Sequence, residues 1–429
     1  MKKLRPLVAA ARTMFLSFFD GQRHKRKRAY EMRRCVRASL AVLLALLPLI
    51  PRSALGDTRV LGGNGDDSVK SLCPLSGGDL LLLGETFSES NTGDVADTAG
   101  AAPLERSTAW AVRLNPEGEV VWQTCYANKN IANTRFIAGI EQDGQLSLYA
   151  TGGEVGNDAL VLLDEEGRKK RIVPMPKDVD VCEVCPSEQG LILAGRTWDD
   201  EAFRPWCALL DASGQTVWSY TGEPFGRLEG RCYYERVDCG DGRIALYEQR
   251  IPFAYMEGYE TFLTVLDFDG NLLSRARIDV SPLQYVAGIT VQDDAVVFFG
   301  SSYDGKADLN TGAVVKLDDT GRLCWNWSAP ALGDNSDIED LLLLEDRYFI
   351  CSTRYDYRSS SYSHVLTGSL SFEGDAQGLQ MLPEKENLTN PKVFSVSQDE
   401  LVLVADVFTE GAERGWRNTM DVFIMKIQQ

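Results

Sequence analysis

The chain has 429 residues, with 44 Lys and Arg against 62 Asp and Glu, a net charge of −18. The first 56 residues hold 13 of the basic and two of the acidic side chains, so the remaining 373 residues carry a net charge of −29. A body this acidic repels phosphate backbones and anionic lipid, which excludes nucleic acids and membrane surfaces as expected partners of the processed chain.

The N-terminal segment has the pattern of a secretory signal peptide. Residues 39–50 form an apolar run that follows three arginines and precedes the small-x-small sequence at residues 54–56. This run is shorter than the ~20 apolar residues that cross a bilayer. We therefore predict a signal peptide with an extended basic n-region over residues 1–56, cleaved before Asp57, and a protein that is secreted or held in the cell envelope. An uncleaved membrane anchor is the alternative.

From residue 57 onward the chain repeats a four-strand pattern. Each repeat opens with a hairpin around a short polar turn, and a third strand follows after a variable loop. Six third strands end in Leu and run into a turn closed by Gly, with 47 to 56 residues between successive glycines. A period near 50 built from strands and turns is typical of a β-propeller. The turns are Leu114-Asn-Pro-Glu-Gly118, Leu163-Asp-Glu-Glu-Gly167, Leu210-Asp-Ala-Ser-Gly214, Leu266-Asp-Phe-Asp-Gly270, Leu317-Asp-Asp-Thr-Gly321 and Leu370-Ser-Phe-Glu-Gly374.

The count of strands predicts how the ring closes. Six repeats are complete, and a seventh supplies three strands, the last of them Met420–Ile427. One orphan strand, Thr58–Leu61, precedes the first repeat. We predict an all-β fold over residues 57–429: a seven-bladed β-propeller of four-stranded antiparallel blades. The N-terminal strand would complete the last blade, built from residues 391–429, and leave no open sheet edge.

The turns followed by Trp resemble the PQQ-type repeat of quinoprotein-like β-propellers, which reads Asp-x-x-Thr-Gly-x-x-x-Trp. Residues 318–325 carry its Asp, Thr-Gly and Trp with one residue fewer between Asp and Thr, residues 211–218 carry Ser for Thr at the same spacing, and residues 115–122 match more loosely. The resemblance implies the propeller fold across most of residues 58–429. Quinone dehydrogenases of this type place carboxylates and an Asn around calcium, and these residues do not map onto this sequence. No quinone cofactor is therefore expected.

Nine cysteines follow residue 56, and most of them are expected to be buried core residues. Cys182 and Cys185 form a CxxC motif inside a predicted strand. Residues i and i+3 of an extended strand lie ~10 Å apart, which is too far for a disulfide. The sequence has no second CxxC motif to complete a zinc site.

Conventional catalytic signatures are scarce in this sequence. His364 is the one histidine after residue 56, so clusters of several histidines are excluded, and we expect His364 to have a structural or solvated role. There is no Gly-x-Ser-x-Gly motif. The acidic loop at residues 304–312 lacks the Glu that ends an EF-hand loop, so we expect solvated turns there and no metal or other cofactor. Acidic residues are numerous, which leaves a carboxylate pair for glycoside cleavage open.

The loops between second and third strands carry aromatic and Arg side chains, which differ from repeat to repeat. Loops held by a rigid scaffold are where binding residues concentrate, although such aromatics can instead fold back over the blade edges. The predicted ligand-binding residues are Trp198, Phe203, Arg204, Phe253, Tyr255, Tyr259, Tyr303, Tyr355, Tyr357, Tyr362 and Trp416.

These observations favour a monomeric binding or scaffold module outside the cell. Its expected partner is a protein or a carbohydrate, recognised through the loop face. We do not expect an enzyme. The alternative is a carboxylate-dependent polysaccharide hydrolase or lyase.

Overall fold

The computed structural model describes residues 55–89, 92–95, 106–127, 133–152, 157–226, 230–252, 259–305, 309–328, 335–356, 362–382, 388–397, 400–410 and 418–428. The segment Gly56–Gln429 forms one compact unit. Most of the predicted signal segment lies outside the described residues. Among those residues, no helix combines the length and the apolar character that a membrane crossing requires.

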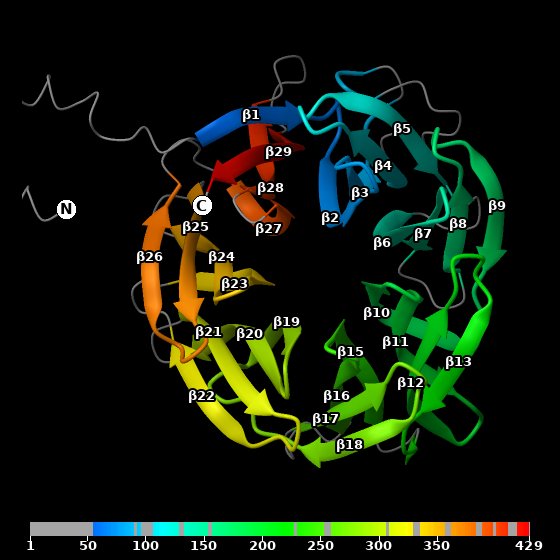
Figure 1. Ribbon diagram of the computed structural model, residues 1–429, viewed down its shortest axis with the longest axis vertical. Helices are drawn as coiled ribbons and strands as arrows, with labels where there is room; N and C mark the ends of the chain where they lie inside the picture. The colour runs from blue at the N-terminus through cyan, green and yellow to red at the C-terminus, as the bar shows by residue number, and fades with distance from the viewer. Residues whose placement is uncertain are drawn as a thin grey trace, which may run out of the picture. The chain divides into compact units, whose positions relative to one another are not determined.

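Seven antiparallel sheets follow one another along the chain and form the blades of a ring (Figure 1). Their innermost strands are β2 (Asp67–Pro74), β6 (Arg135–Gln142), β10 (Val179–Ser187), β15 (Gly230–Gly240), β19 (Tyr285–Gln292), β23 (Ser336–Leu343) and β27 (Leu388–Ser397). The second strands are β3 (Leu80–Thr86), β7 (Gln145–Thr151), β11 (Gly190–Trp198), β16 (Arg243–Pro252), β20 (Ala295–Asp304), β24 (Arg347–Asp356) and β28 (Glu400–Glu410).

The third and fourth strands complete each blade toward the rim of the ring. The third strands are β4 (Thr108–Leu114), β8 (Ala159–Leu163), β12 (Ala202–Leu210), β17 (Glu260–Asp267), β21 (Leu309–Asp318), β25 (Tyr362–Ser371) and β29 (Asn418–Gln428). The fourth strands are β5 (Val120–Tyr126), β9 (Lys169–Pro174), β13 (Thr216–Thr221), β18 (Leu272–Arg277), β22 (Leu323–Ser328) and β26 (Ala376–Met381). We number the blades 1 to 7 from β2 to β27.

The predicted closure of the ring is confirmed. Strand β1 (Leu55–Leu61) lies beside β29, and blade 7 has the order β1-β29-β28-β27. The strand begins three residues earlier than the predicted Thr58–Leu61. Blade 3 has a feature that the sequence did not predict, because the short strand β14 (Phe225–Gly226) pairs with the start of β12.

The hydrophobic core lies between neighbouring blades. One cluster joins Trp110 and Val112 of blade 1 to Val404 and Ile424 of blade 7, and each of the other clusters likewise joins two successive blades. Both faces of a blade are therefore covered. Strand β4, for example, is buried on both faces.

The repeated turn at the end of each third strand has a structural role. In the second such turn, Gly167 has φ +75°, and the main-chain N–H of Arg168 donates a hydrogen bond to the Asp164 carboxylate over 2.8 Å. The Asp211 carboxylate accepts main-chain hydrogen bonds from Ser213 and Gln215, both at 2.9 Å. These contacts satisfy main-chain donors that the turn would otherwise leave exposed.

The Trp that follows these turns clamps one blade to the next. The indole N–H groups of Trp122, Trp218 and Trp325 each donate to a carbonyl oxygen in the following blade's turn, over 2.9, 2.9 and 2.7 Å. Each ring also covers the glycine of that turn. A Cβ atom placed on Gly167 would lie 2.7 Å from the Trp122 ring, so this position accepts only glycine without rearrangement. The Trp clamps join blades 1 and 2, 3 and 4, and 5 and 6.

A β-bulge interrupts the innermost strand of each blade. In blades 1 to 6 the extra residue falls at the same level of the strand, and in blade 7 the register shifts between Thr389 and Lys392. A bulge leaves one residue unpaired and re-aims its side chain. The bulged residues of blades 1 to 6 are Lys70, Ile137, Cys182, Glu235, Ala287 and Glu339.

Candidate functional site

The antiparallel blades give the ring two unlike faces. The turns that join first to second strands, and third to fourth strands, lie on one face, which we call the turn face. The loops between second and third strands, and the links between blades, lie on the other, which we call the loop face. Seven of the eleven predicted ligand-binding residues are described by the structure, and these lie at or beside strand ends on the loop face.

A cavity of about 590 Å³ is bounded by the inner strands of blades 1, 2 and 3, and we call it the axial cavity. Its lining includes three bulged residues, Lys70, Ile137 and Cys182, so the bulges help to direct side chains toward the ring axis. A volume of this size falls in the range of ligand sites in proteins. Its charged and thiol-bearing lining residues are Lys70, Arg135, Asp158, Asp180, Cys182 and Glu183.

The charges of the axial cavity are mixed and partly paired. The Lys70 ammonium group lies 3.6 Å from the Glu85 carboxylate, and Asp180 forms an ion pair with Arg196 over 2.7 Å. Arg135 is exposed. The cavity therefore offers both a cation and carboxylate acceptors to a bound polar group.

Two carboxyl groups of the cavity have perturbed acidity. Burial raises the pKa of Asp158, whose Oδ2 atom accepts a hydrogen bond from the Tyr149 hydroxyl over 2.8 Å. Burial also raises the pKa of Glu183 to about 7, although the nearby Arg236 opposes the shift. The Glu183 Oε2 atom accepts the main-chain N–H of Val237, in blade 4, over 2.7 Å. A carboxyl group with a pKa near neutrality can hold or release a proton under ordinary conditions.

Arg196 links the axial cavity to a predicted loop residue. Besides its ion pair with Asp180, the guanidinium carbon lies 5.1 Å from the centre of the Phe203 ring and 5.9 Å from that of Tyr233. These distances fit cation–π contact. A ligand that displaced Asp180 from Arg196 would therefore also affect the aromatic side chains beside the loop.

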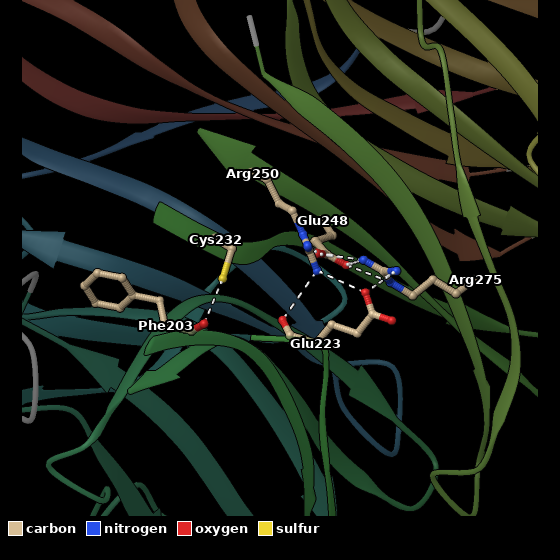
Figure 2. A network of polar contacts seen from close by, with 6 residues as sticks. All are labelled: Phe203, Glu223, Cys232, Glu248, Arg250 and Arg275. Carbon is tan, nitrogen blue, oxygen red and sulfur yellow. Dashed lines mark hydrogen bonds and ion pairs between the residues drawn. The ribbon is translucent and has the colours of Figure 1, made fainter. Parts of the chain in front are cut away.

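A buried ionic network supports the same part of the loop face (Figure 2). The fully buried Glu248 carboxylate accepts hydrogen bonds from Arg250, at 2.7 Å, and from Arg275, at 3.1 Å. Glu223 binds Arg275 over 3.1 Å and thereby ties the segment before β14 to blade 4. Both arginines lie over the Phe262 ring, with centroid distances of 5.1 and 4.2 Å.

Glu248 stands where most blades have a small residue. It pairs with the residue before the bulge, and the equivalent positions elsewhere are Gly84, Ala150, Gly195, Gly300, Ser352 and Asp406. Buried ion pairs contribute little net stability, because desolvation offsets their attraction. We interpret the network as a positioning device, since β14 pairs with β12 at Phe203.

A second cavity, of about 350 Å³, lies on the loop face beside blades 4 and 5. Tyr259 lines it and is 49% exposed. Arg277 and Glu260 also line it and form an ion pair over 3.3 Å. Asp279 completes the polar lining, and its pKa is lowered by hydrogen bonds from Ser281.

The structure describes seven of the eleven predicted residues and brings only those of blade 3 together. Trp198 and Phe203 pair with each other across the β11–β12 hairpin and are half-buried, while Arg204 forms an ion pair with Asp199 over 3.4 Å. Tyr259 and Tyr303 are 49% and 45% exposed, whereas Tyr355 is half-buried. Tyr362 begins β25, and its side chain is not described. Phe253, Tyr255, Tyr357 and Trp416 lie outside the described residues.

Sequence reasoning missed the residues of the axial cavity. Arg135, Asp180 and Glu183 lie on inner strands, whereas the predicted binding residues all came from the loops between second and third strands. One signal was present: charged residues interrupt otherwise apolar strands, as in Glu235-Arg236 and Glu339-Asp340. The exposed Tyr285, which is 52% accessible at the start of β19, was also missed.

The structure also shows the positions of the cysteines and of His364. Six of the nine described thiols are buried, as expected for most of them, and none of the nine forms a disulfide. Cys182 and Cys185 lie in β10, as predicted, but Cys182 is exposed at the bulge. His364 lies within β25. Within the described ranges, no group of three or more His, Cys, Asp or Glu side chains is arranged to hold a metal ion.

Solved structures similar to this chain share its fold. The polysaccharide lyase Uly1 superposes with a TM-score of 0.52 at 7% identity, over 87% of this chain and 99% of that protein. A protein of unknown function from Dyadobacter fermentans superposes with a TM-score of 0.50 at 12% identity, over 88% and 100%. The β-propeller domain of the Trilobed protease from Pyrococcus furiosus gives 0.47 at 9% identity, over 85% and 95%.

The sequence matches no protein-family model and no curated protein. At identities this low, the structural similarity shows the β-propeller fold alone. Membership of the PQQ-type repeat family therefore stays a prediction.

Proposed function

We propose that this protein is a binding module that holds a polar group of a carbohydrate or protein partner in the axial cavity. The observation that carries the proposal is the mixed charge of that cavity, which comes from three blades and reaches the loop face through Arg196. The β-propeller fold suits a binding or scaffold module. As part of the same proposal, the chain is exported, its repeats are of the PQQ type, and it acts as a monomer.

The size of the cavity favours a small group over a folded surface. About 590 Å³ accommodates a sugar unit or a short peptide segment. Carbohydrates present many hydroxyl groups, which both Arg donors and carboxylate acceptors can bind. The exposed rings of Tyr259 and Tyr303 offer apolar contact area elsewhere on the same face. A carbohydrate ligand therefore matches more of the observed chemistry than a protein ligand does.

The experiment is a glycan array run in parallel with capture of proteins from the producing cell's envelope and medium. Any ligand found is then titrated against Arg135→Ala and Asp180→Asn. We expect each variant to weaken binding about tenfold, as the loss of a central polar contact does. Asp211→Ala, in a turn on the opposite face, is the matched control and should bind normally. Equal affinity of both cavity variants and the parent would refute the proposal.

A carboxylate-dependent polysaccharide hydrolase or lyase is the second candidate. Glu183, Asp158 and Asp180 line one cavity, and the pKa of Glu183 is raised to about 7, which suits a general acid. The fold is shared with the polysaccharide lyase Uly1, but at 7% identity. The test is release of reducing or unsaturated sugar ends from a panel of acidic polysaccharides. Glu183→Gln should abolish any activity found, while an unchanged rate would exclude this role.

A further inference from the structure

Two thiols from successive blades meet on the turn-face side of the inner strands. Cys185 lies near the end of β10 and Cys239 near the end of β15, and their Sγ atoms are 3.4 Å apart. The residues are 54 positions apart in the sequence. No sequence motif links these two cysteines, which belong to different repeats.

The surroundings of the pair suit a reaction between the two sulfur atoms. Both thiols also donate a hydrogen bond to the carbonyl oxygen of Pro186 over 3.5 Å, and this shared acceptor keeps the two sulfur atoms close together. Cys185 is buried, and the Asp238 Oδ1 atom lies 3.6 Å from its sulfur. Cys239 is partly exposed and can be reached from solvent.

We propose that Cys185 and Cys239 form a reversible disulfide that joins blades 3 and 4. A disulfide requires the sulfurs to approach from 3.4 Å to ~2.05 Å, a movement of about 1.4 Å. Both residues lie near strand ends and Cys239 is not fully enclosed, so we expect rotation about the two side-chain torsions to supply this shift. The proposal does not depend on the ligand of the axial cavity.

The oxidant is an external low-molecular-mass disulfide. The Cys239 thiolate attacks one of its sulfurs, which forms a mixed disulfide and releases one thiolate. Cys185 then loses its proton to solvent or to the adjacent Asp238 carboxylate and attacks the Cys239 sulfur, releasing the second thiolate. Two protein thiols are oxidised and one external disulfide is reduced to two thiols.

The bond would constrain the part of the ring that carries the axial cavity. Strand β10 supplies Asp180, Cys182 and Glu183 to that cavity and Cys185 to the bridge. The bond closes a loop of 54 residues, and loops of this length lose considerable entropy in the unfolded state. For a domain of this size, we expect the melting temperature to rise by about 3–8 °C on oxidation.

The test compares the purified chain after dithiothreitol with the chain after oxidised glutathione. Intact mass should fall by about 2 Da on oxidation, since two hydrogens leave with the bond formed. Peptide mapping without reduction should recover one linked pair that contains Cys185 and Cys239. Cys185→Ser and Cys239→Ser should each abolish both the mass change and the rise in melting temperature.

Cys324→Ser is the matched control, because Cys324 is exposed on β22, in blade 5. This variant should oxidise like the parent chain. Two outcomes would overturn the proposal. In the first, Cys185 and Cys239 remain alkylatable after oxidation of folded protein. In the second, mapping shows that Cys239 pairs with Cys182 instead.

Discussion

The turn face and the loop face of this ring are made by the same repeats, but they differ in how much their residues vary from blade to blade. On the turn face, Asp-capped turns and the indole rings of Trp122, Trp218 and Trp325 recur with nearly constant geometry. Toward the loop face, equivalent positions diverge, and Glu248 replaces the small residue that most other blades place there. The comparison indicates that the repeated residues of the turn face stabilise the fold. The variable residues toward the loop face are where we expect ligand specificity.

The two regions also differ in the environment of their carboxyl groups. The Asp side chains of the repeated turns accept main-chain hydrogen bonds, and the pKa values of Asp211 and Asp318 are lowered. Hydrogen bonds to the ionised form cause this shift. Around the ring axis, burial raises the pKa of Glu183 and of Glu339 to about 7. Perturbation of this kind is a feature of functional sites, although structural networks share it.

The largest effect is expected from opening the ring. Deleting residues 57–63 removes most of β1 and exposes the edge of β29 in blade 7. It also removes Leu61, which is fully buried between blades 7 and 1. We expect the melting temperature to fall by about 10 °C or more, with aggregation through the free edge. A synthetic peptide of residues 55–63 should restore part of the loss, and an unchanged melting temperature would show that β1 does not close the ring.

The next largest effect tests the Trp clamps. Trp218→Ala removes the ring that covers Gly270 and the hydrogen bond to the Phe268 carbonyl. Replacing a large, well-packed aromatic residue typically costs about 3 kcal/mol of unfolding free energy. Val217→Ala, beside it on the exposed side of β13, should change stability by less than about 0.5 kcal/mol. Ligand affinity should not change in either variant, and a Trp218→Ala variant as stable as the parent would contradict the clamp.

The features that repeat from blade to blade could be predicted from the sequence, whereas the contacts between particular blades could not. The turns, the Trp positions and the closing strand were all predicted, because each depends on local chemistry that repeats every ~50 residues. The axial cavity was not predicted, since it forms where Lys70, Arg135 and Asp180 meet from three blades. The Cys185–Cys239 contact was missed for the same reason. The sequence period shows which residues the blades share. It does not show which non-repeated residues of different blades lie close together in the fold.

The third prediction uses pH to distinguish the axial region from the turn face. The folded-state pKa of Glu183 is raised from its usual value near 4.5 to about 7, so the folded protein binds this proton more tightly than the unfolded chain does. Its contribution to stability is therefore full below about pH 4.5 and is lost as pH rises through about 7. Glu183→Gln should remove this loss. The unfolding free energy of the variant minus that of the parent should therefore increase between pH 5 and pH 8.

The control for that measurement is Asp211→Asn, because hydrogen bonds lower the pKa of Asp211 and its carboxylate stays ionised from pH 5 to pH 8. Its unfolding free energy relative to the parent should stay constant over the same pH range. Denaturant titrations at several pH values measure both differences. Parallel profiles for the parent and Glu183→Gln would mean that Glu183 does not titrate as the structure indicates.

A smaller effect is expected at the exposed tyrosines of the loop face. Once a ligand is known, Tyr259→Ala or Tyr303→Ala should weaken its binding by about 1 kcal/mol in at least one case, because exposed aromatic rings supply contact area. Tyr259→Phe and Tyr303→Phe keep the ring and should retain most of the affinity. If the Phe variants lose as much as the Ala variants, the hydroxyl groups rather than the rings make the contact.

The smallest effect is expected from the turn carboxylates, and it completes the comparison of the two faces. Asp211→Ala removes the acceptor for the main-chain N–H groups of Ser213 and Gln215. Both donors can bind water instead, because the turn is near the surface, so the loss of stability should stay below about 1 kcal/mol. Asp211→Asn keeps one acceptor oxygen and should lose less than Asp211→Ala. Isothermal titration should give the same ligand affinity for both variants as for the parent. If affinity falls in these variants while Arg135→Ala binds normally, the working face has been assigned to the wrong side of the ring.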